Sequence, residues 1–505
     1  MSLRSLMVAA FAFLAVSMPA VAQEQDAPQL PETPEAWRAA AETDLEALRT
    51  LIREDTPAAF DSENPIMQRW YERGYRQARS RLRRVNDQAS YYYLLLGYVT
   101  GFRDPHLSLG AQMRLASARW PGFVATADGD DVVVFSRDEA DANTPAVGAR
   151  LISCDGLNPA TFRARNIYPF SLNPGLAGDR RRSATRIFMD RQNPFGPAPR
   201  RCVFNEGGTR RTITLSWRDV PGDDYWDQYS LASLGPGAPL DVTTPAEGVA
   251  WIGVPTFDNG AGEQLQALVD RIAADAPAMR AGRAIVIDVR GNGGGNSEWG
   301  VRVARALWGD DIIDAIPGDD RPGAVDWRAS PGNRDYIAEF TPELARQFGA
   351  ESEIVQWAHR AHDGINGAIS RGDAFWRDRE LGETAEISVS GGYTQQRPTG
   401  PSPIPARVYV LSNGVCASAC LDFSDIILHI PGVQLVGADT SGDGLMMEIR
   451  TTMLPSGLVQ VGLPMKVYRG RGRGPLEAYR ADIAYSGVWS DEAVRAWVMG
   501  LIEAQ

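Results

Sequence analysis

The stretch ARVYVLSNGVCASAC, residues 406–420, joins a strand pattern to a helix start and carries a serine in the turn between them. Residues 406–411 are mostly β-branched, aromatic or aliphatic, which is typical of a buried strand. The SNG triplet at 412–414 predicts a tight turn. Ser418 then lies where backbone N–H groups at a helix start can stabilise an oxyanion, so it is a candidate nucleophile. The alternative is that the ASA triplet at 417–419 only makes a close helix-packing contact.

The chain contains four cysteines, Cys154, Cys202, Cys416 and Cys420, and the last two flank Ser418. An even number predicts two disulfides, with three possible pairings. We favour Cys154–Cys202 and Cys416–Cys420, since an i,i+4 spacing near a helix start brings the second pair just close enough. That bond would clamp the turn around Ser418. Four buried free thiols are the alternative, and we expect neither a metal site nor a cofactor.

The N-terminus has the pattern of a secretory signal. Arg4 precedes an apolar run, Leu6 to Val16, that is too short to span a bilayer comfortably. The small residues of AVA at 20–22 predict cleavage after Ala22. We therefore expect residues 1–22 to be removed and the mature chain to be periplasmic or secreted, in a bacterium, without a stable membrane anchor. A retained anchor is the alternative.

Composition limits the functions open to the chain. Its 505 residues exceed one hydrophobic core, so two or three domains are expected. A formal net charge of −12 argues against a nucleic-acid partner. Lys466 is the only lysine, which nearly removes lysine from the possible catalytic bases.

Periodicity divides the chain into three regions after the signal. Residues 23–110 have helical spacing and end in a loop that carries His106. Residues 111–220 lose that spacing and predict a small β-rich domain. Residues 225–505 alternate strand and helix patterns, interrupted at about 309–403 by an insertion with a helical stretch. The fold class predicted for the core is α/β, built from βαβ units.

A second strand pattern in the core ends in glycines. Residues 284–290 are predicted to form a strand with a continuous apolar run, as a parallel sheet covered on both faces requires, and they lead into the GNGGG of 291–295. Glycines let backbone amides approach a ligand closely. A phosphate loop or a mere tight turn is the alternative, but a Walker loop would need a lysine that this run lacks.

Four stretches of the core together resemble the C-terminal processing peptidases, the serine-protease family that includes tail-specific proteases and the tricorn core. They are WIGVPTF at 251–257, IDVRGNGGG at 287–295, VLSN with ASA at 410–419, and VGADTSG at 436–442. The resemblance implies a crotonase/ClpP-like core, and residues 111–220 resemble a degenerate PDZ domain.

The sequence departs from part of that family at Asp443, which stands where the Ser–Lys branch has its lysine. A Ser–Lys dyad then requires Lys466 to fold into the site. The tricorn-like branch instead takes a histidine from the N-terminal region, and the DPH segment ending at His106 is similar to that part. Asp104 within this segment is the alternative acid for orienting the histidine ring, since it is closer in sequence, but we expect it to cap its own loop instead.

The resemblance implies an exported serine endopeptidase that acts on peptide or protein substrates. Ser418 would be the nucleophile, His106 the base and Glu477 the acid that orients it. Ala419 and Gly294 would supply the oxyanion-hole N–H groups. Two other functions remain open: an inactive peptide-binding or scaffold protein, favoured by Asp443, and an esterase or amidase for small substrates.

Overall fold

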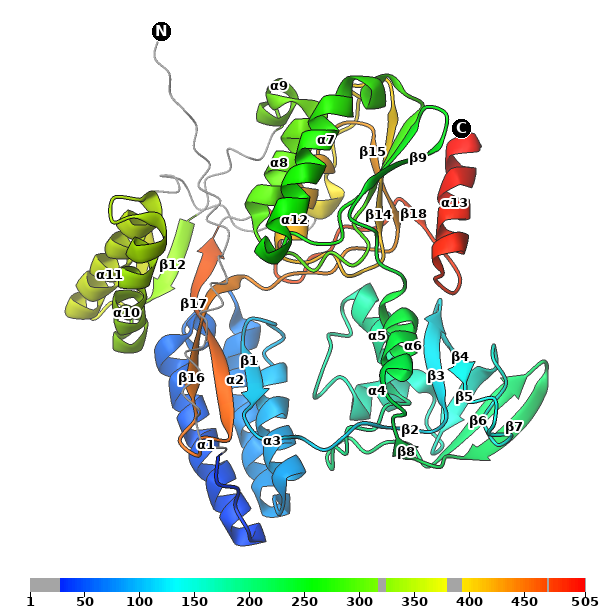
Figure 1. Cartoon of the computed structure of the whole chain (residues 1–505). Coiled ribbons are helices and arrows are strands. Elements are labelled where there is room, and N and C mark those ends of the chain that lie inside the picture. The colour runs from blue at the N-terminus through cyan, green and yellow to red at the C-terminus, as the bar shows by residue number, and fades with distance from the viewer. Residues whose placement is uncertain (1–27, 317–323, 379–392, 470–471, 505) are drawn as a thin grey trace.

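The computed structural model describes residues 28–316, 324–378, 393–469 and 472–504. The predicted signal at 1–22 lies outside these residues. Three parts of the molecule follow one another along the chain: an N-terminal helical group, a small β-rich unit, and a larger α/β unit in the second half (Figure 1). Within the described part of the chain, none of the helices combines the length and the apolar character needed to cross a membrane.

The larger unit is built on a six-stranded sheet in the order β18-β15-β14-β11-β10-β9. All neighbouring strands are parallel except β9, which pairs antiparallel with β10. The strands are β9 (Val242–Ala246), β10 (Val249–Gly253), β11 (Ala284–Asp288), β14 (Arg407–Ser412), β15 (Val433–Gly437) and β18 (Ile483–Ala484). The two apolar runs of the sequence therefore form the adjacent central strands β11 and β14. β11 is buried throughout, and β14 is buried at every residue except Arg407.

Helices cover both faces of this sheet, which explains why the central strand β11 carries apolar side chains on both faces. One face packs against α7 (Gly262–Ala281), α8 (Ser297–Trp308), α9 (Asp310–Asp314) and α12 (Ala419–Ile427). The opposite face packs against α13 (Asp491–Glu503) (Figure 1). Ile285 and Ile287 point to the first face, whereas Val286 points to the second. Successive side chains of β11 thus pack into two separate apolar cores on opposite faces of the sheet.

The N-terminal helices form a core with the C-terminal hairpin. They are α1 (Pro34–Asp55), α2 (Pro65–Arg81) and α3 (Gln88–Thr100). Thr33 caps α1 by accepting the Ala36 N–H at 3.1 Å, as the Thr-Pro-Glu start predicts. The hairpin is β16 (Met446–Met453) and β17 (Val459–Arg469), and β17 also pairs with β1 (Ser108–Ala111), which follows the helices.

The insertion extends the same hairpin rather than the six-stranded sheet. It contains β12 (Ala324–Arg328), α10 (Pro331–Phe348), α11 (Glu353–Arg371) and β13 (Phe375–Asp378), and β12 pairs antiparallel with β17. The single helical stretch expected here is two helices, because Gly349 ends α10 with a φ of +89°.

The β-rich unit is a five-stranded antiparallel sheet with two helices. Its strands are β3 (Phe123–Asp128), β4 (Asp131–Arg137), β5 (Arg150–Cys154), β6 (Arg201–Glu206) and β7 (Thr209–Thr214), with β2 (Arg119–Trp120) paired to β8 (Arg218–Asp219) beside it. The helices are α4 (Pro159–Asn166) and α5 (Ala177–Arg186), and α6 (Asp223–Leu234) leads on to the larger unit. The arrangement is compatible with the PDZ-like expectation. Cys154 and Cys202 join β5 to β6, which confirms the first predicted disulfide.

Candidate active site

Ser418 occupies a strained position between β14 and α12. Its φ of 53° and ψ of −126° lie outside the regions that residues with a side chain prefer. As the N-cap of α12, its carbonyl accepts the Leu421 N–H at 2.7 Å. The serine is therefore held half-exposed at the N-terminus of a helix whose following residues are buried. This is the strand–turn–helix setting that places a nucleophile beside backbone N–H groups.

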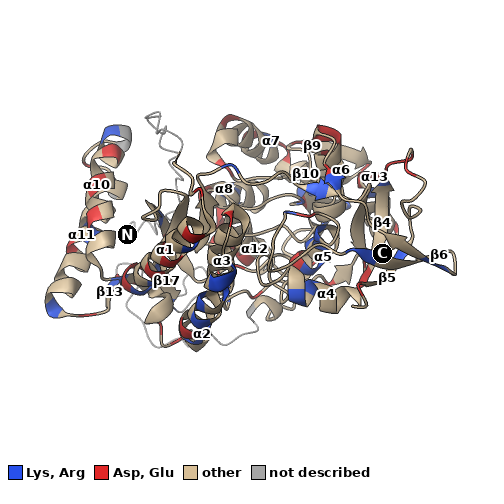
Figure 2. Ribbon diagram, turned by 90° about the horizontal axis from the view of Figure 1, so that it is seen from below, with Lys and Arg blue, Asp and Glu red and all other residues tan. Residues whose placement is uncertain are grey.

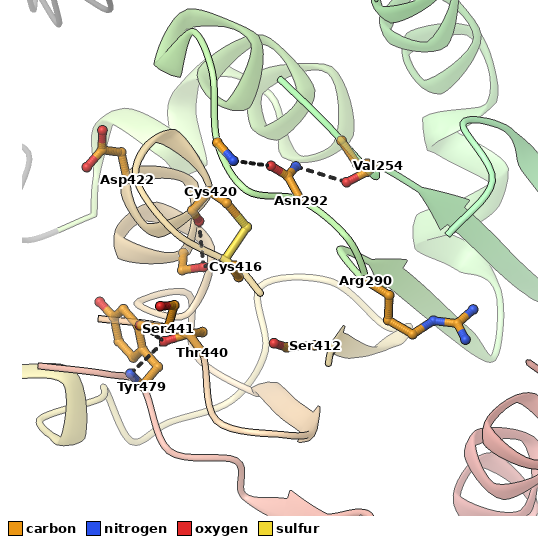
Figure 3. Close-up of a disulfide and its surroundings, with 12 residues drawn as sticks. Val254, Arg290, Asn292, Ser412, Cys416, Cys420, Asp422, Thr440, Ser441 and Tyr479 are labelled. Carbon is orange, nitrogen blue, oxygen red and sulfur yellow. Dashed lines mark hydrogen bonds between the residues drawn. A yellow bond between two sulfur atoms is a disulfide. The ribbon is translucent and has the colours of Figure 1, made fainter. Parts of the chain in front are cut away.

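The flanking cysteines form the second predicted disulfide. The Cα atoms of Cys416 and Cys420 are 5.3 Å apart, and both residues are fully buried. Figure 3 shows this bond beside the loop that carries Asn292. The confirmed pairing closes a covalent ring around Ser418.

The glycine run approaches this turn closely at Gly294. A Cβ atom added there would lie 2.7 Å from the Ala417 carbonyl oxygen, 2.7 Å from the Ser418 Cβ and 3.0 Å from the Ala419 nitrogen. Its φ is +107°, so both space and conformation require glycine. The Gly294 N–H donates to Asn292 Oδ1 at 2.9 Å, and the Asn292 amide in turn donates to the Val254 carbonyl (Figure 3). The Asn292 side chain thus fixes the loop to the end of β10, while the loop backbone contacts the serine turn.

His106 is held by Asp104, two residues before it. One carboxylate oxygen of Asp104 accepts the His106 backbone N–H at 3.0 Å and lies 3.1 Å from ring Nδ1. The other oxygen accepts the Met446 N–H at 3.3 Å, and the Asp104 side chain is fully buried. Asp104 therefore caps its loop, as expected, and also fixes the imidazole.

A short segment after β15 connects the serine turn with the histidine. The Ser441 N–H donates to the Cys416 carbonyl at 2.9 Å, which anchors the segment to the disulfide turn. Two residues later, Asp443 Oδ1 lies 4.0 Å from His106 Nε2. A Cβ on Gly444 would lie 2.1 Å from Asp104 Oδ2, so the segment also packs tightly on that carboxylate. Nδ1 of the ring thus faces Asp104, while Nε2 faces the Asp443 segment.

Glu477 lies on the neighbouring loop. The Leu476 N–H donates to the Asp443 carbonyl at 2.7 Å, which fixes this loop to the segment that faces His106. The Glu477 carboxylate accepts the Gly474 N–H at 2.7 Å and the Thr394 hydroxyl at 3.0 Å. The same small region of the fold therefore holds three acids: Asp104, Asp443 and Glu477.

Arg473 ties that loop to the serine helix, and sequence reasoning missed it. Its fully buried guanidinium donates to Asp425 at 2.9 Å and to Asp422 at 3.2 Å, both on α12. Burial favours the neutral form, but the carboxylates of Asp425 and Asp422 outweigh it and raise the pKa of Arg473. Tyr479 adds a hydroxyl to Asp425 at 2.8 Å. These partners lie about fifty positions apart, so no local pattern could have indicated them.

A second ion pair, fully buried, lies at the end of β11, where the glycine loop begins. Arg290 donates to Asp288 at 2.7 Å with both side chains inaccessible to solvent, and it also reaches Asp491 on α13 at 2.8 Å. Asn413 accepts the Gly291 N–H at 3.2 Å and donates to the Leu234 carbonyl at 2.9 Å. The glycine loop and the serine turn are thus fastened to each other at their bases.

Lys466, the conditional base of a Ser–Lys dyad, lies elsewhere. It stands on β17 opposite Trp327 of β12, in the sheet of the hairpin and insertion rather than in the sheet of β14. Its Nζ forms an ion pair with Glu448 at 3.1 Å and lies 4.9 Å from the centre of the Trp327 ring. The dyad considered for Lys466 is therefore wrong, because this ammonium belongs to a buried aromatic and acidic environment in another sheet.

Among the described residues, no group of three or more metal-ligating side chains is present.

Comparison with known proteins identifies part of the chain. Residues 248–483 match peptidase family S41. Two solved structures that resemble the whole fold are mature CPAF, with 14% identity, a TM-score of 0.59 and coverage of 93% of this chain and 98% of that chain, and mature CPAF complexed with lactacystin, with 15% identity, a TM-score of 0.56 and coverage of 93% and 100%. No curated protein matches the sequence. The resemblance drawn from the four core stretches and the predicted α/β class are thereby confirmed.

Proposed function

Because the chain contains a domain of peptidase family S41, we propose that it is an exported serine endopeptidase that cleaves peptide bonds through an acyl-enzyme on Ser418. The observation that carries the proposal is the position of Ser418. It stands in a strained turn at the N-terminus of α12, with the Gly294 backbone packed directly against it. Strain of this kind concentrates at functional sites.

In the proposed mechanism, His106 acts as the general base. Ser418 Oγ attacks the peptide carbonyl carbon while the imidazole takes the hydroxyl proton. The tetrahedral intermediate then collapses, the C–N bond breaks, and the imidazolium gives its proton to the leaving amine. Water hydrolyses the ester by the same sequence and releases Ser418. Nε2 is the reacting nitrogen, since Nδ1 is occupied by Asp104.

The developing oxyanion is assigned to the Ala419 N–H together with the Gly294 loop. As the first residue of α12, Ala419 has no carbonyl one turn earlier in the helix to which it can donate. The Gly294 N–H is engaged by Asn292, so it could serve only if that bond is shared or released on substrate binding. One oxyanion donor is typically worth about 10²–10³ in rate.

Two acids compete for the role of orienting His106. Glu477 is the residue that the family resemblance implies, and it lies on the loop fastened to the Asp443 segment. Asp104 is the acid with a contact to the ring at 3.1 Å. We propose Asp104 as the partner of Nδ1 and retain Glu477 as a candidate for shaping the Nε2 side.

Export is supported by two disulfides in the described residues, since such bonds persist in oxidising compartments. The apolar N-terminal run and the AVA motif at 20–22 support secretion by a cleaved signal. A periplasmic or extracellular location follows from this proposal.

The deciding experiment is labelling with a fluorophosphonate probe. We expect the purified mature protein to be labelled at Ser418, and the Ser418→Ala variant to remain unlabelled while its thermal unfolding is unchanged. His106→Ala should slow labelling strongly. Equal labelling of wild type and Ser418→Ala would rule out this nucleophile, whereas an unlabelled wild type would favour a non-catalytic peptide-binding protein.

A second measurement separates a peptidase from an esterase or amidase for small substrates. A peptidase should degrade a reduced and carboxymethylated protein in a Ser418-dependent reaction. Hydrolysis of a small aryl ester without any degradation of the unfolded protein would contradict the endopeptidase proposal. The two assays use the same preparation, so loss of folding cannot explain a difference between them.

A further inference from the structure

A cavity lies where the N-terminal helices meet the β-rich unit, apart from the serine turn. Its volume is about 250 Å³. α3 supplies Tyr92, Tyr93 and Leu96, and the segment around α4 supplies Phe162 and Phe170. Small-molecule sites usually measure roughly 300–1,000 Å³, so this cavity suits one bulky apolar side chain better than a cofactor.

Two arginines stand among these apolar walls. Arg186 at the end of α5 and Arg191 just beyond it both line the cavity. Among the residues that the structure describes, neither guanidinium has a carboxylate within 4.0 Å. The acid that lines the cavity, Asp190, is engaged by Arg119 and by the Gln192 N–H. The positive charge at the cavity is therefore not neutralised locally.

Further arginines extend this positive region toward α2. Arg81 stacks over the ring of Phe170 at 5.0 Å, and Arg84 stacks over Phe195 at 4.9 Å. In the described part of the chain these two also lack an acidic partner within 4.0 Å. Burial and the nearby Arg84 lower the pKa of Arg81, as expected where like charges gather. Figure 2 marks basic residues on α2, α4 and α5.

Such a surface is unusual for a chain with a formal net charge of −12. Four arginines without acidic partners attract carboxylates, and guanidinium groups bind them with paired hydrogen bonds. The cavity lined by Arg186 and Arg191 adds a recess with mainly apolar walls, which a flat anionic surface such as a membrane would leave empty. A ligand that both fills the cavity and pairs with the arginines would carry an apolar group and acidic groups.

We propose that this cavity is a binding site for an acidic peptide segment, with one bulky apolar side chain in the socket and flanking carboxylates on Arg186 and Arg191. Its purpose, recognition of protein substrates away from the serine turn, rests on the proposed peptidase function. Binding itself requires no chemistry and can be measured without it.

The test uses the full mature chain with Ser418→Ala, so that the probe stays intact. The probe is a fluorescein-labelled peptide, Glu-Glu-Phe-Glu-Glu, with both ends capped so that no terminal charge contributes. Fluorescence anisotropy should show saturable binding that weakens as salt rises. Replacing Phe by Gly, or every Glu by Gln, should weaken binding about tenfold or more, since each removes one half of the recognition.

Protein variants locate the site. Arg186→Gln and Arg191→Gln should each weaken binding about tenfold. Arg210→Gln is the matched control, because Arg210 is exposed on β7 at the far edge of the β-rich sheet and should leave binding unchanged. Thermal unfolding of all three variants checks that they are folded.

Three results would overturn the proposal: equal binding of the Phe and Gly peptides, equal weakening by Arg210→Gln, or binding of anionic phospholipid vesicles without binding of the peptide. Labelling of Ser418 by the fluorophosphonate in the wild type is independent of these results. The failure of this binding site and the failure of the proposed function are therefore distinguishable.

Discussion

Ser418 holds a backbone conformation that costs free energy and that only its surroundings maintain. Positions of this kind cost about 1–3 kcal/mol for a residue with a side chain, and glycine avoids most of that cost. We expect Ser418→Gly to raise the free energy of unfolding by about 1 kcal/mol, measured by urea denaturation. Ser418→Ala keeps the Cβ atom and should leave stability nearly unchanged. Equal stabilisation by both variants would show that the hydroxyl, not the φ angle, is the source.

The carboxylate of Asp104 should govern the reactivity of His106. It accepts the His106 N–H and contacts Nδ1, so Asp104→Asn should leave the loop folded but remove the charge that stabilises the imidazolium. We expect the fluorophosphonate labelling rate to fall by about 10²–10⁴-fold. Glu477→Gln is the matched comparison, because Glu477 is the other candidate acid. A larger loss in Glu477→Gln than in Asp104→Asn would transfer the orienting role to Glu477.

At the scale of elements, local sequence patterns predicted the features that depend on residues close together in the chain, such as strands and a short disulfide. The apolar runs became β11 and β14, and the i,i+4 spacing of Cys416 and Cys420 predicted their bond. The sequence did not reveal that β17 would pair with both β1 and β12, since strand pairing depends on residues far along the chain. Capping its own loop was the role preferred for Asp104 over orienting the ring, because its contact with the histidine ring depends on how the side chains pack.

The two disulfides should have different consequences. Cys416 and Cys420 enclose the serine turn, whereas Cys154 and Cys202 join two strands 48 positions apart. Replacing the first pair by alanine should lower the labelling rate at Ser418 about tenfold or more, since small misplacements of a nucleophile are costly. Loop-closure entropy assigns this short ring about 2 kcal/mol of stability and the longer ring about 4 kcal/mol.

The Cys154→Ala/Cys202→Ala variant is the control for that prediction. It should lose more stability in urea than the Cys416→Ala/Cys420→Ala variant, yet label at the normal rate under conditions where it is folded. Slower labelling of the control alone would show that the bond between β5 and β6, not the clamp, governs the site.

At the scale of the whole molecule, β17 joins three parts of the chain that are far apart in sequence. It pairs with β1 after the N-terminal helices, with β16 in its own hairpin and with β12 of the insertion. Buried charges reinforce the last junction. Asp326 on β12 accepts from Arg377 at 2.7 Å and from Arg469 on β17 at 2.8 Å, and Arg469 also reaches Asp61 near the N-terminal helices at 2.8 Å.

This junction predicts a defined sensitivity to acid. Burial alone would raise the pKa of Asp326, but the hydrogen bonds from Arg377 and Arg469 lower it below its usual value. Since the folded pKa is depressed, the stabilisation is fully present above the unfolded pKa, at about 4, and is lost as the pH falls through the folded value. The free energy of unfolding in urea should therefore decrease below pH 4. Asp326→Asn should be less stable at pH 7, because it removes the buried carboxylate that Arg377 and Arg469 share, and its stability should fall less steeply in acid. The exposed Asp227→Asn is the control and should follow the wild-type acid curve. An identical acid dependence in Asp326→Asn and wild type would assign the acid sensitivity to other carboxylates and leave this junction without a role in it.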